Sequence, residues 1–301
     1  MPKELDGRCG VCGVHEIYCC GSRVRISSRG ADVLTEPLIE CCPLHKTLYG
    51  ANEIDAETVK SCVEKKIRDF GLCCRNRRFD SDPMVAYGAS EMMSVWLEKG
   101  SIDCAVVVCD GAGTAITNNG RFVQGIGARL TGIVHTSPIQ EVIERIERNG
   151  GHVLDKAYAR IDQLEGVKLA VKRGFRHIAV SVAGFQTEAI SEIRRFEDTE
   201  KIGVLVFSVC NTRVEKRDVK HITKSDLVCA SASTTLRREI GKRALLQIGV
   251  TIPVYALTPK GKELALTYLA AFKDKLVVFR ANQLPYDVRD RGPRMRTSTR
   301  K

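Results

Sequence analysis

Short apolar segments alternate with amphipathic segments after residue 100, and this alternation constrains the fold more than any other feature of the chain. Runs rich in Val and Ile predict strands at 104–110, 129–135, 177–183, 203–210, 226–231 and 252–257, with a further run at 275–279 at the end of the sheet. Helical spacing predicts helices near 138–149, 162–173, 185–197, 233–248 and 259–272. Near-continuous apolar strands are typical of strands buried on both faces, so the sequence predicts an α/β fold with a mostly parallel, doubly wound sheet.

Composition divides the chain into three parts. Residues 1–80 form a small cysteine-rich N-terminal region with weak periodicity, apart from a helix expected over 55–69. Residues 81–282 hold the α/β domain, and residues 283–301 form a basic tail that we expect to be flexible. Asn119-Gly120 stands between two short runs of alternating character, which predicts a β-hairpin over 113–127.

The residues that follow the expected strands are candidate ligand contacts, because open parallel sheets bind ligands beyond the carboxyl ends of their strands. These residues include a carboxylate, an imidazole, a thiol, an arginine and several hydroxyl groups. The set is Asp110, Gly111, Gly113, Thr114, His135, Ser137, Gly184, Cys210, Asn211, Arg213, Ser231 and Ser233. Arg213 suits an anionic group, and His135 suits acid–base chemistry or a metal. We therefore expect a small-molecule pocket, with no reaction defined.

Several of these residues also have a purely structural interpretation. Gly111 and Gly113 could form only a tight turn, and Asp110 could be a turn residue. Ser137 and Ser233 could cap the helices that follow them. The glycines match neither the dinucleotide-binding motif nor the P-loop, so neither cofactor class is indicated.

The chain has thirteen cysteines, and nine of them fall within residues 9–74. We expect a soluble cytoplasmic protein with reduced thiols, since no early segment resembles a signal peptide and no apolar run reaches the ~20 residues of a membrane helix. Clustered cysteines then indicate metal or redox chemistry rather than disulfides, and packing is the alternative for any single one. The candidate ligands are Cys9, Cys12, Cys19, Cys20, Cys41, Cys42 and His45.

The spacing of these cysteines suggests one four-ligand set. The CxxC pair at residues 9–12 can direct two sulfurs to one metal, and His15 is a reserve ligand. Adjacent cysteines point to opposite sides of an extended chain, so one member of each CC pair, at 19–20 and 41–42, would complete the set. Zinc and an iron–sulfur cluster both accept four such ligands, and the spacing matches neither a zinc ribbon nor a ferredoxin run.

The formal net charge of +11 is concentrated in the tail, where residues 289–301 hold six basic residues and one acidic residue. Such a tail could contact nucleic acid or an acidic partner. The chain has no basic patch interleaved with aromatic residues, the pattern that single-strand binders use. A nucleic-acid function is therefore the least favoured of those considered.

Three long stretches resemble the methanogenesis marker protein 8 family. They are GVHEIYCCGSRVRI (13–26), YGASEMMSVWLEKGSIDCAVVVCDGAGTAI (87–116) and SDLVCASASTTLRREIGKRALLQIGVTIPVYALTPKGKELALTYL (225–269), and the resemblance extends over nearly all of the chain except the tail. It implies an anaerobic archaeal cytoplasm and a role near methyl-coenzyme M reductase, such as its maturation or activation. In that setting an iron–sulfur cluster is favoured over zinc. No catalytic residue is implied.

Two hypotheses follow from these observations. The leading one is an accessory protein of methanogenesis that holds a metal or iron–sulfur cluster with its N-terminal cysteines and a small ligand at the sheet edge. Its partners would be methyl-coenzyme M reductase or the maturation factors of that enzyme. The alternative is a small-molecule enzyme of coenzyme biosynthesis in which a zinc site is purely structural.

Overall fold

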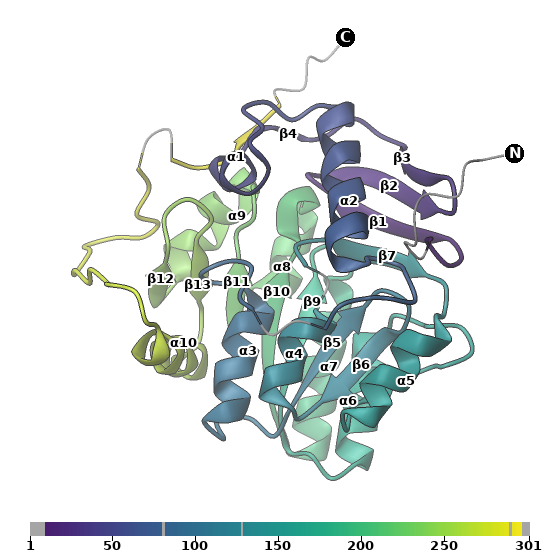
Figure 1. Cartoon of the computed structure of the whole chain (residues 1–301). Coiled ribbons are helices and arrows are strands. Elements are labelled where there is room, and N and C mark those ends of the chain that lie inside the picture. Colours follow the sequence, from purple (N-terminus) through teal and green to yellow (C-terminus); the bar gives the residue numbers. More distant parts are fainter. Residues whose placement is uncertain (1–9, 80–81, 128, 289–290, 297–301) are drawn as a thin grey trace, which may run out of the picture.

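The computed structural model describes residues 10–79, 82–127, 129–288 and 291–296. Its largest sheet contains β5 (Cys104–Cys109), β6 (Gly113–Thr117), β8 (His152–Val153), β9 (His177–Ala183), β10 (Gly203–Val209), β11 (Leu227–Cys229), β12 (Leu246–Ile248) and β13 (Val254–Ala256). The spatial order is β12-β13-β11-β10-β9-β5-β6-β8 (Figure 1). The four central strands, β11, β10, β9 and β5, are parallel, and an antiparallel pair flanks them at each edge.

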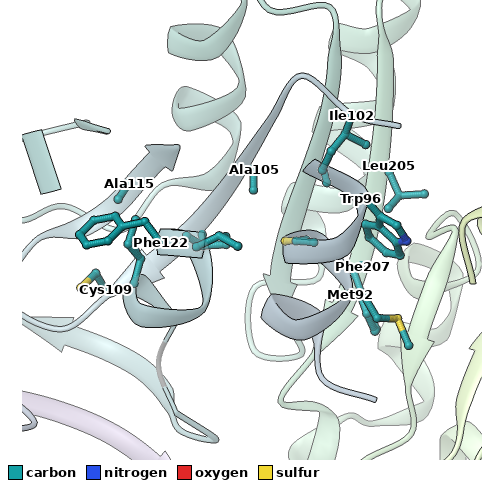
Figure 2. Close-up of a cluster of buried hydrophobic side chains, with 14 of the residues drawn as sticks. Met92, Trp96, Ile102, Ala105, Cys109, Ala115, Phe122, Leu205 and Phe207 are labelled. Carbon is teal, nitrogen blue, oxygen red and sulfur yellow. The ribbon is translucent and has the colours of Figure 1, made fainter. Parts of the chain in front are cut away.

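Helices cover both faces of this sheet. One face packs against α3 (Ala89–Glu98), α4 (Gly120–Ile126), α5 (Gln140–Arg148) and α10 (Pro259–Ala271), and the other against α6 (Gln163–Lys172), α7 (Glu188–Glu200), α8 (Val219–Ile222) and α9 (Thr234–Glu239). Alternating residues of β5 serve the two cores: Ala105 faces the first and Val106 the second. Trp96 is fully buried on the first face beside Leu205 and Phe207 (Figure 2). The predicted α/β class with a doubly wound sheet is confirmed.

A second unit lies over the carboxyl ends of the parallel strands (Figure 1). We call it the N-terminal unit, although two of its strands come from later in the chain. It consists of β1 (His15–Cys19), β2 (Ser22–Ser27), β3 (Gly30–Val33), β4 (Ile39–Cys41), α1 (Pro43–Tyr49), α2 (Ala56–Phe70), β7 (Gly132–Thr136) and β14 (Arg294–Met295). The strand order is β3-β2-β1-β7, and β14 pairs with β4. Residues of these elements form a separate apolar core.

Helix α2 forms close to where the sequence predicts it. Its start is capped by the carboxylate of Asp55, which accepts a hydrogen bond from the backbone N–H of Thr58 at 2.7 Å. Its end is set by Gly71, whose φ of 68° is left-handed and whose N–H donates to the carbonyl of Ile67. The helix directs Val59, Cys62, Val63 and Lys66 toward the interior.

The hairpin predicted over 113–127 is wrong. The turn lies earlier, at residues 110–112, where β5 pairs with β6 in antiparallel register. Asn119 instead caps helix α4, because its side chain accepts a hydrogen bond from the N–H of Arg121. The residues that follow bury Phe122, Val123 and Ile126 against the core at helical spacing. Tertiary burial therefore overrides the local Asn-Gly turn preference.

Three other predicted elements differ from the structure. The run at 275–279 forms no strand, and its Val277 is 90% exposed, because none of the described strands pairs with it. The helix predicted over 233–248 stops at Glu239, and β12 follows it. The strand predicted over 129–135 becomes β7, which pairs with β1 rather than with the large sheet.

Candidate ligand-binding site

A cavity of about 510 Å³ lies between the N-terminal unit and the carboxyl ends of the parallel strands. One side of it is built by β1, α1 and α2, and the other by the ends of β5, β9, β10 and β11. Its volume falls in the range of about 300–1,000 Å³ that is typical of small-molecule sites. The cysteine-rich region and the sheet edge, which the sequence analysis treated as two sites, thus contribute to a single cavity.

One wall of the cavity, residues 84–91, is held by the buried carboxylate of Glu91. This carboxylate accepts hydrogen bonds from the backbone N–H groups of Met84 at 3.0 Å and Val85 at 3.2 Å, and from the amide of Gln124 at 2.9 Å. A carboxylate that binds two backbone groups fixes the path of the chain. The wall is therefore preorganised rather than a loose loop.

Six free cysteines line the cavity, and they are Cys19, Cys20, Cys42, Cys62, Cys210 and Cys229. The neighbouring Cys20 thiol, together with burial, raises the pKa of Cys19 to about 12, and the Cys19 thiol and burial raise the pKa of Cys62 to about 12. Burial raises the pKa of Cys210 to about 12. These three thiols keep their protons at neutral pH, so this part of the wall carries no resting thiolate.

A strained backbone surrounds the same cavity. Eight described residues other than glycine have a positive φ, between 43° and 64°. Five of the eight line the cavity, and they are Cys20, Arg129, Leu130, Cys210 and Ser231. Left-handed conformations of residues with a Cβ cost energy and cluster at functional sites. This concentration supports a role for the cavity beyond packing.

Three of the twelve predicted ligand contacts line the cavity: Cys210, Arg213 and Ser231. The exposed guanidinium of Arg213 donates to the carbonyl of Gly21 at 2.7 Å and lies over the ring of Tyr18. Arg213 therefore lines the cavity at the junction of the two units, and part of its hydrogen-bonding capacity is used by Gly21.

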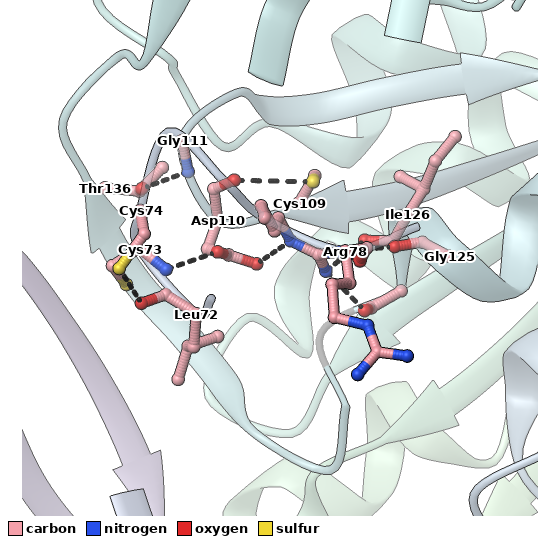
Figure 3. A network of polar contacts seen from close by, with 12 residues as sticks. Leu72, Cys73, Cys74, Arg78, Cys109, Asp110, Gly111, Gly125, Ile126 and Thr136 are labelled. Carbon is pink, nitrogen blue, oxygen red and sulfur yellow. Dashed lines mark hydrogen bonds and ion pairs between the residues drawn. The ribbon is translucent and has the colours of Figure 1, made fainter. Parts of the chain in front are cut away.

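Asp110 does not line the cavity, because its carboxylate is used inside the protein. One oxygen accepts a hydrogen bond from the guanidinium of Arg77 at 2.6 Å, and the other accepts from the N–H of Cys73 at 2.7 Å (Figure 3). Arg77 also donates to the carbonyls of Gly125 and Gly127. Both side chains are about 1% exposed, so this ion pair joins the N-terminal unit to the large sheet.

Most of the other predicted contacts have structural roles. Gly111 lies in the turn between β5 and β6, Gly113 begins β6, and Thr114 donates a hydrogen bond to Gln163 at 2.8 Å. Ser233 caps helix α9, as its structural interpretation proposed. None of these four residues lines the cavity.

The remaining four are also outside the cavity. Ser137 bonds through its hydroxyl to the backbone of Val14 instead of capping a helix. Asn211 donates to the carbonyl of Cys229 at 2.8 Å, and Gly184 packs so closely against Asn211 that a Cβ would overlap it. His135 is exposed and lines a separate surface depression.

The cysteines predicted as one metal site are distributed over several places. Cys9 lies outside the described residues. Cys12 precedes β1, whereas Cys19 ends it, and a strand of five residues about 13 Å long separates them. Cys41 belongs to β4 and pairs with Arg294, while Cys20, Cys42 and His45 line the cavity.

The positions of these cysteines show whether Cys12 and Cys19 could bind one metal ion together. A zinc–sulfur bond is about 2.3 Å long, so one ion cannot bind sulfurs at both ends of a strand. In the described part of the chain, no group of three or more His, Cys, Asp or Glu side chains is arranged to hold a metal ion. Cys12 and Cys19 therefore do not fit one shared metal ion, and the full four-ligand set, which includes Cys9 outside the described residues, stays a prediction.

His15, the reserve ligand, has both ring nitrogens occupied. Nε2 is 2.7 Å from the carbonyl of Cys12, so it carries the proton, and Nδ1 then accepts from the hydroxyl of Thr136 at 2.7 Å. Thr136 in turn accepts from the N–H of Gly111 at 2.7 Å. The neutral imidazole is thus fully satisfied, and it links β1 to the turn after β5.

The buried His15 should make folding stability depend on pH. Burial lowers the pKa of His15 below its ordinary 6.5; Asp110 opposes the shift, and His135 adds to it. The unfolded chain therefore binds more protons, so stability is fully present above pH 6.5 and falls as the pH decreases through that value. Urea denaturation between about pH 7.5 and pH 5.5 should show a slope of at most about 1.4 kcal/mol per pH unit from this group, smaller in His15→Gln. An equal slope in both proteins would contradict this assignment.

Three polar side chains line the cavity that were not predicted as ligand contacts from the sequence. They are Tyr49, Lys66 and His45, of which His45 was predicted only as a metal ligand. Lys66 had a visible signal, because it follows Val59, Cys62 and Val63 on the apolar side of α2. A lysine at such a position is rarely buried without a reason.

No helix in the described ranges is both long and apolar enough to cross a lipid bilayer.

Residues 15–270 match the model of a family described as "Uncharacterized protein conserved in archaea (DUF2099)". The chain is 42% identical over 247 residues to "Uncharacterized protein MJ0054" of Methanocaldococcus jannaschii, covering 81% of this chain and 86% of that protein. The chain belongs to this archaeal family.

Proposed function

We propose that this member of the archaeal family binds a small organic molecule in the cavity between its N-terminal unit and its large sheet. The observation that carries the proposal is the coincidence of three features at one place: a cavity of about 510 Å³, six thiols, and five of the eight strained residues. Packing alone gives no reason to keep so much strain around an open space. The neutral state of three of the thiols favours binding over resting nucleophilic chemistry.

Filling the cavity should abolish binding. Ala183 ends β9 and lines the cavity, so Ala183→Phe introduces a ring where the ligand would lie. Wild type and variant are purified under gentle anaerobic conditions, and native mass spectrometry records any small molecule that stays bound. We expect a bound species in the wild type and at least about a tenfold lower occupancy in Ala183→Phe. The matched control is Ala271→Phe, whose position at the end of α10 is exposed.

An equal occupancy in the wild type and Ala183→Phe would contradict the proposal, because the ligand would then lie elsewhere. A loss in Ala271→Phe as well would point to a general effect of added aromatic surface. Thermal melting of each variant accompanies the experiment, so that a misfolded Ala183→Phe protein is recognised.

The family resemblance suggests a setting for this binding function. An accessory role beside methyl-coenzyme M reductase, or beside its maturation factors, is supported by the resemblance and by the relative in a methanogen. As a test, a labelled sample of the full chain is mixed with purified methyl-coenzyme M reductase and separated by size-exclusion chromatography. Co-elution of the label that disappears with excess unlabelled chain supports the role, and separate elution at micromolar concentrations opposes it.

A further inference from the structure

Three buried polar side chains, His45, Tyr49 and Lys66, lie together on one wall of the cavity. His45 and Tyr49 are four residues apart on α1 and so share a face of that helix, with ring centroids 4.7 Å apart. Lys66 comes from α2, and its Nζ lies 5.9 Å from the centroid of the Tyr49 ring. His45 is 6% exposed and Lys66 is 2% exposed, so both are buried although the cavity reaches them.

These groups have unused hydrogen-bonding capacity. Neither ring nitrogen of His45 nor the hydroxyl of Tyr49 has a hydrogen-bond partner of normal geometry among the described residues. The Cys62 thiol interacts with both side chains, but a neutral thiol is only a weak donor and acceptor, so most of their capacity is left over. Within the same ranges, no carboxylate forms an ion pair with Lys66, whereas the exposed Lys65 pairs with Asp69 at 3.3 Å. Buried polar groups are nearly always paired, so three incompletely paired groups on one wall indicate a missing component.

Among the described residues, no ion pair supplies a counter-charge for the Lys66 ammonium. Its ionisable neighbours are the thiols of Cys19, Cys62 and Cys20 and the hydroxyl of Tyr49. The pKa of each thiol is raised to about 12, and burial raises the pKa of Tyr49. Cys19, Cys62 and Tyr49 are therefore neutral at physiological pH, and a neutral thiol is a weak acceptor.

The character of the missing component follows from the donors. An ammonium offers three donors and no acceptor, a neutral imidazole offers one donor, and a phenol hydroxyl can donate. A carboxylate, phosphate or sulfonate is rich in acceptors and carries the charge that Lys66 lacks, and charge-assisted hydrogen bonds to such groups are the strong ones. The rest of the wall is mainly apolar. Leu44 and Leu48 come from α1 of the N-terminal unit, and Met84 comes from the segment 84–91.

We propose that Lys66, together with His45 and Tyr49, binds the acidic group of a small molecule whose remaining part is apolar. This inference rests on the proposed function, since it needs the cavity to be a binding site, and it adds the class of ligand. Lys66 provides the charge on this wall of the cavity, and the two α1 side chains provide directed hydrogen bonds.

The test compares probes of equal chain length with different head groups. Octanoate, octyl phosphate and octane-1-sulfonate carry the acidic group, and 1-octanol and octylamine are the neutral and cationic counterparts. Isothermal titration calorimetry on the full chain should give dissociation constants at least about tenfold lower for one or more of the anions than for octanol. The ranking among the three anions identifies which acidic group the site prefers.

Variants connect the preference to the named residues. Lys66→Met should weaken binding of the preferred anion at least about thirtyfold while leaving octanol unchanged, because it removes the charge and keeps an apolar chain. Tyr49→Phe removes only a hydroxyl and should weaken that anion by about three- to tenfold. The control is Lys65→Met, next to Lys66 but exposed and paired with Asp69, which should leave every constant unchanged.

Several outcomes would overturn the inference. Equal affinity for octanol and the anions would do so, as would an unchanged anion affinity in Lys66→Met. Reductive trapping of octanal as an adduct on Lys66, without any preference for anions, would assign the amine to imine chemistry instead. If octanol binds in a way that Ala183→Phe abolishes but no anion binds better, the ligand class is wrong and the proposed function stands. If Ala183→Phe alters no probe, the proposed function itself fails.

Discussion

Replacing Arg77 with methionine is expected to lower the free energy of unfolding by about 3–5 kcal/mol, the range for removing one partner of a buried ion pair. The guanidinium of Arg77 binds Asp110 and also donates to the carbonyls of Arg78, Gly125 and Gly127. Methionine fills a similar volume but leaves the Asp110 carboxylate buried, with the N–H of Cys73 as its one remaining hydrogen-bond partner in the described part of the chain. Guanidinium chloride denaturation followed by circular dichroism measures the loss.

The control for this change is Arg68→Met on α2. Arg68 is 52% exposed on its side chain and pairs with Asp69, so its loss should change stability by no more than about 0.5 kcal/mol. In the double variant Arg77→Met/Asp110→Leu, the lone charge is gone, so the two single effects should not add and the coupling should be about 1–3 kcal/mol. Additive single effects would mean that the pair does not act as a unit.

Alanine at position 113 should be the second most damaging of the predicted substitutions, at about 3 kcal/mol or more from backbone strain and overlap combined. Gly113 has a φ of 69°, and a Cβ there would overlap the backbone carbonyl of Ala159. Backbone atoms cannot swing aside as the end of a flexible side chain can, so β6 or the segment at Ala159 must shift. Thermal unfolding of Gly113→Ala measures the cost.

Gly100 provides a matched control for this prediction. Its φ of 66° is nearly the same as that of Gly113, but no atom lies within 4 Å of the Cβ position. Gly100→Ala should therefore cost only about 1 kcal/mol, the conformational part alone. If the two alanine variants melt at the same temperature, overlap with Ala159 contributes nothing and the close packing there is not required.

The regular part of the fold could be predicted because its signals are local. Near-continuous Val and Ile runs identified β9 and β10, since a strand buried on both faces needs apolar residues at every position. The helix predicted over 55–69 corresponds to α2, whose ends are set by a capping Asp55 and by Gly71, residue types that favour these positions. In these elements the local preference and the tertiary environment agree.

The differences arise where the environment decides. The segment at 275–279 has strong strand character, but a strand forms only with a neighbour, and none of the described strands pairs with it. The sequence of strand β7 resembles that of the other apolar strands, and it does not specify β1 as the partner of β7. Asn119 is suited to both a turn and a helix cap, and the burial of Phe122 selects the cap.

The candidate site could be anticipated only in part. Reading the residues after each strand found Cys210 and Ser231, because strand ends converge in any open parallel sheet. The same procedure included Asp110, since its pairing with Arg77 depends on a contact between residues 33 positions apart. His45, Tyr49 and Lys66 meet only because α1 and α2 pack over the sheet, an arrangement that spacing along the chain does not reveal.

The two late strands of the N-terminal unit have a consequence for the order in which the protein assembles during synthesis. Strand β7 lies more than a hundred residues after β1, and β14 pairs with β4 across about 250 residues. A ribosome therefore releases the cysteine-rich segment long before β7 can complete the four-stranded sheet, and β4 gains its partner β14 only when residue 295 has emerged. The lining of the cavity runs from Tyr18 to Pro293, so the cavity is a late product of folding, and ligand occupancy would report that nearly all of this span has been made.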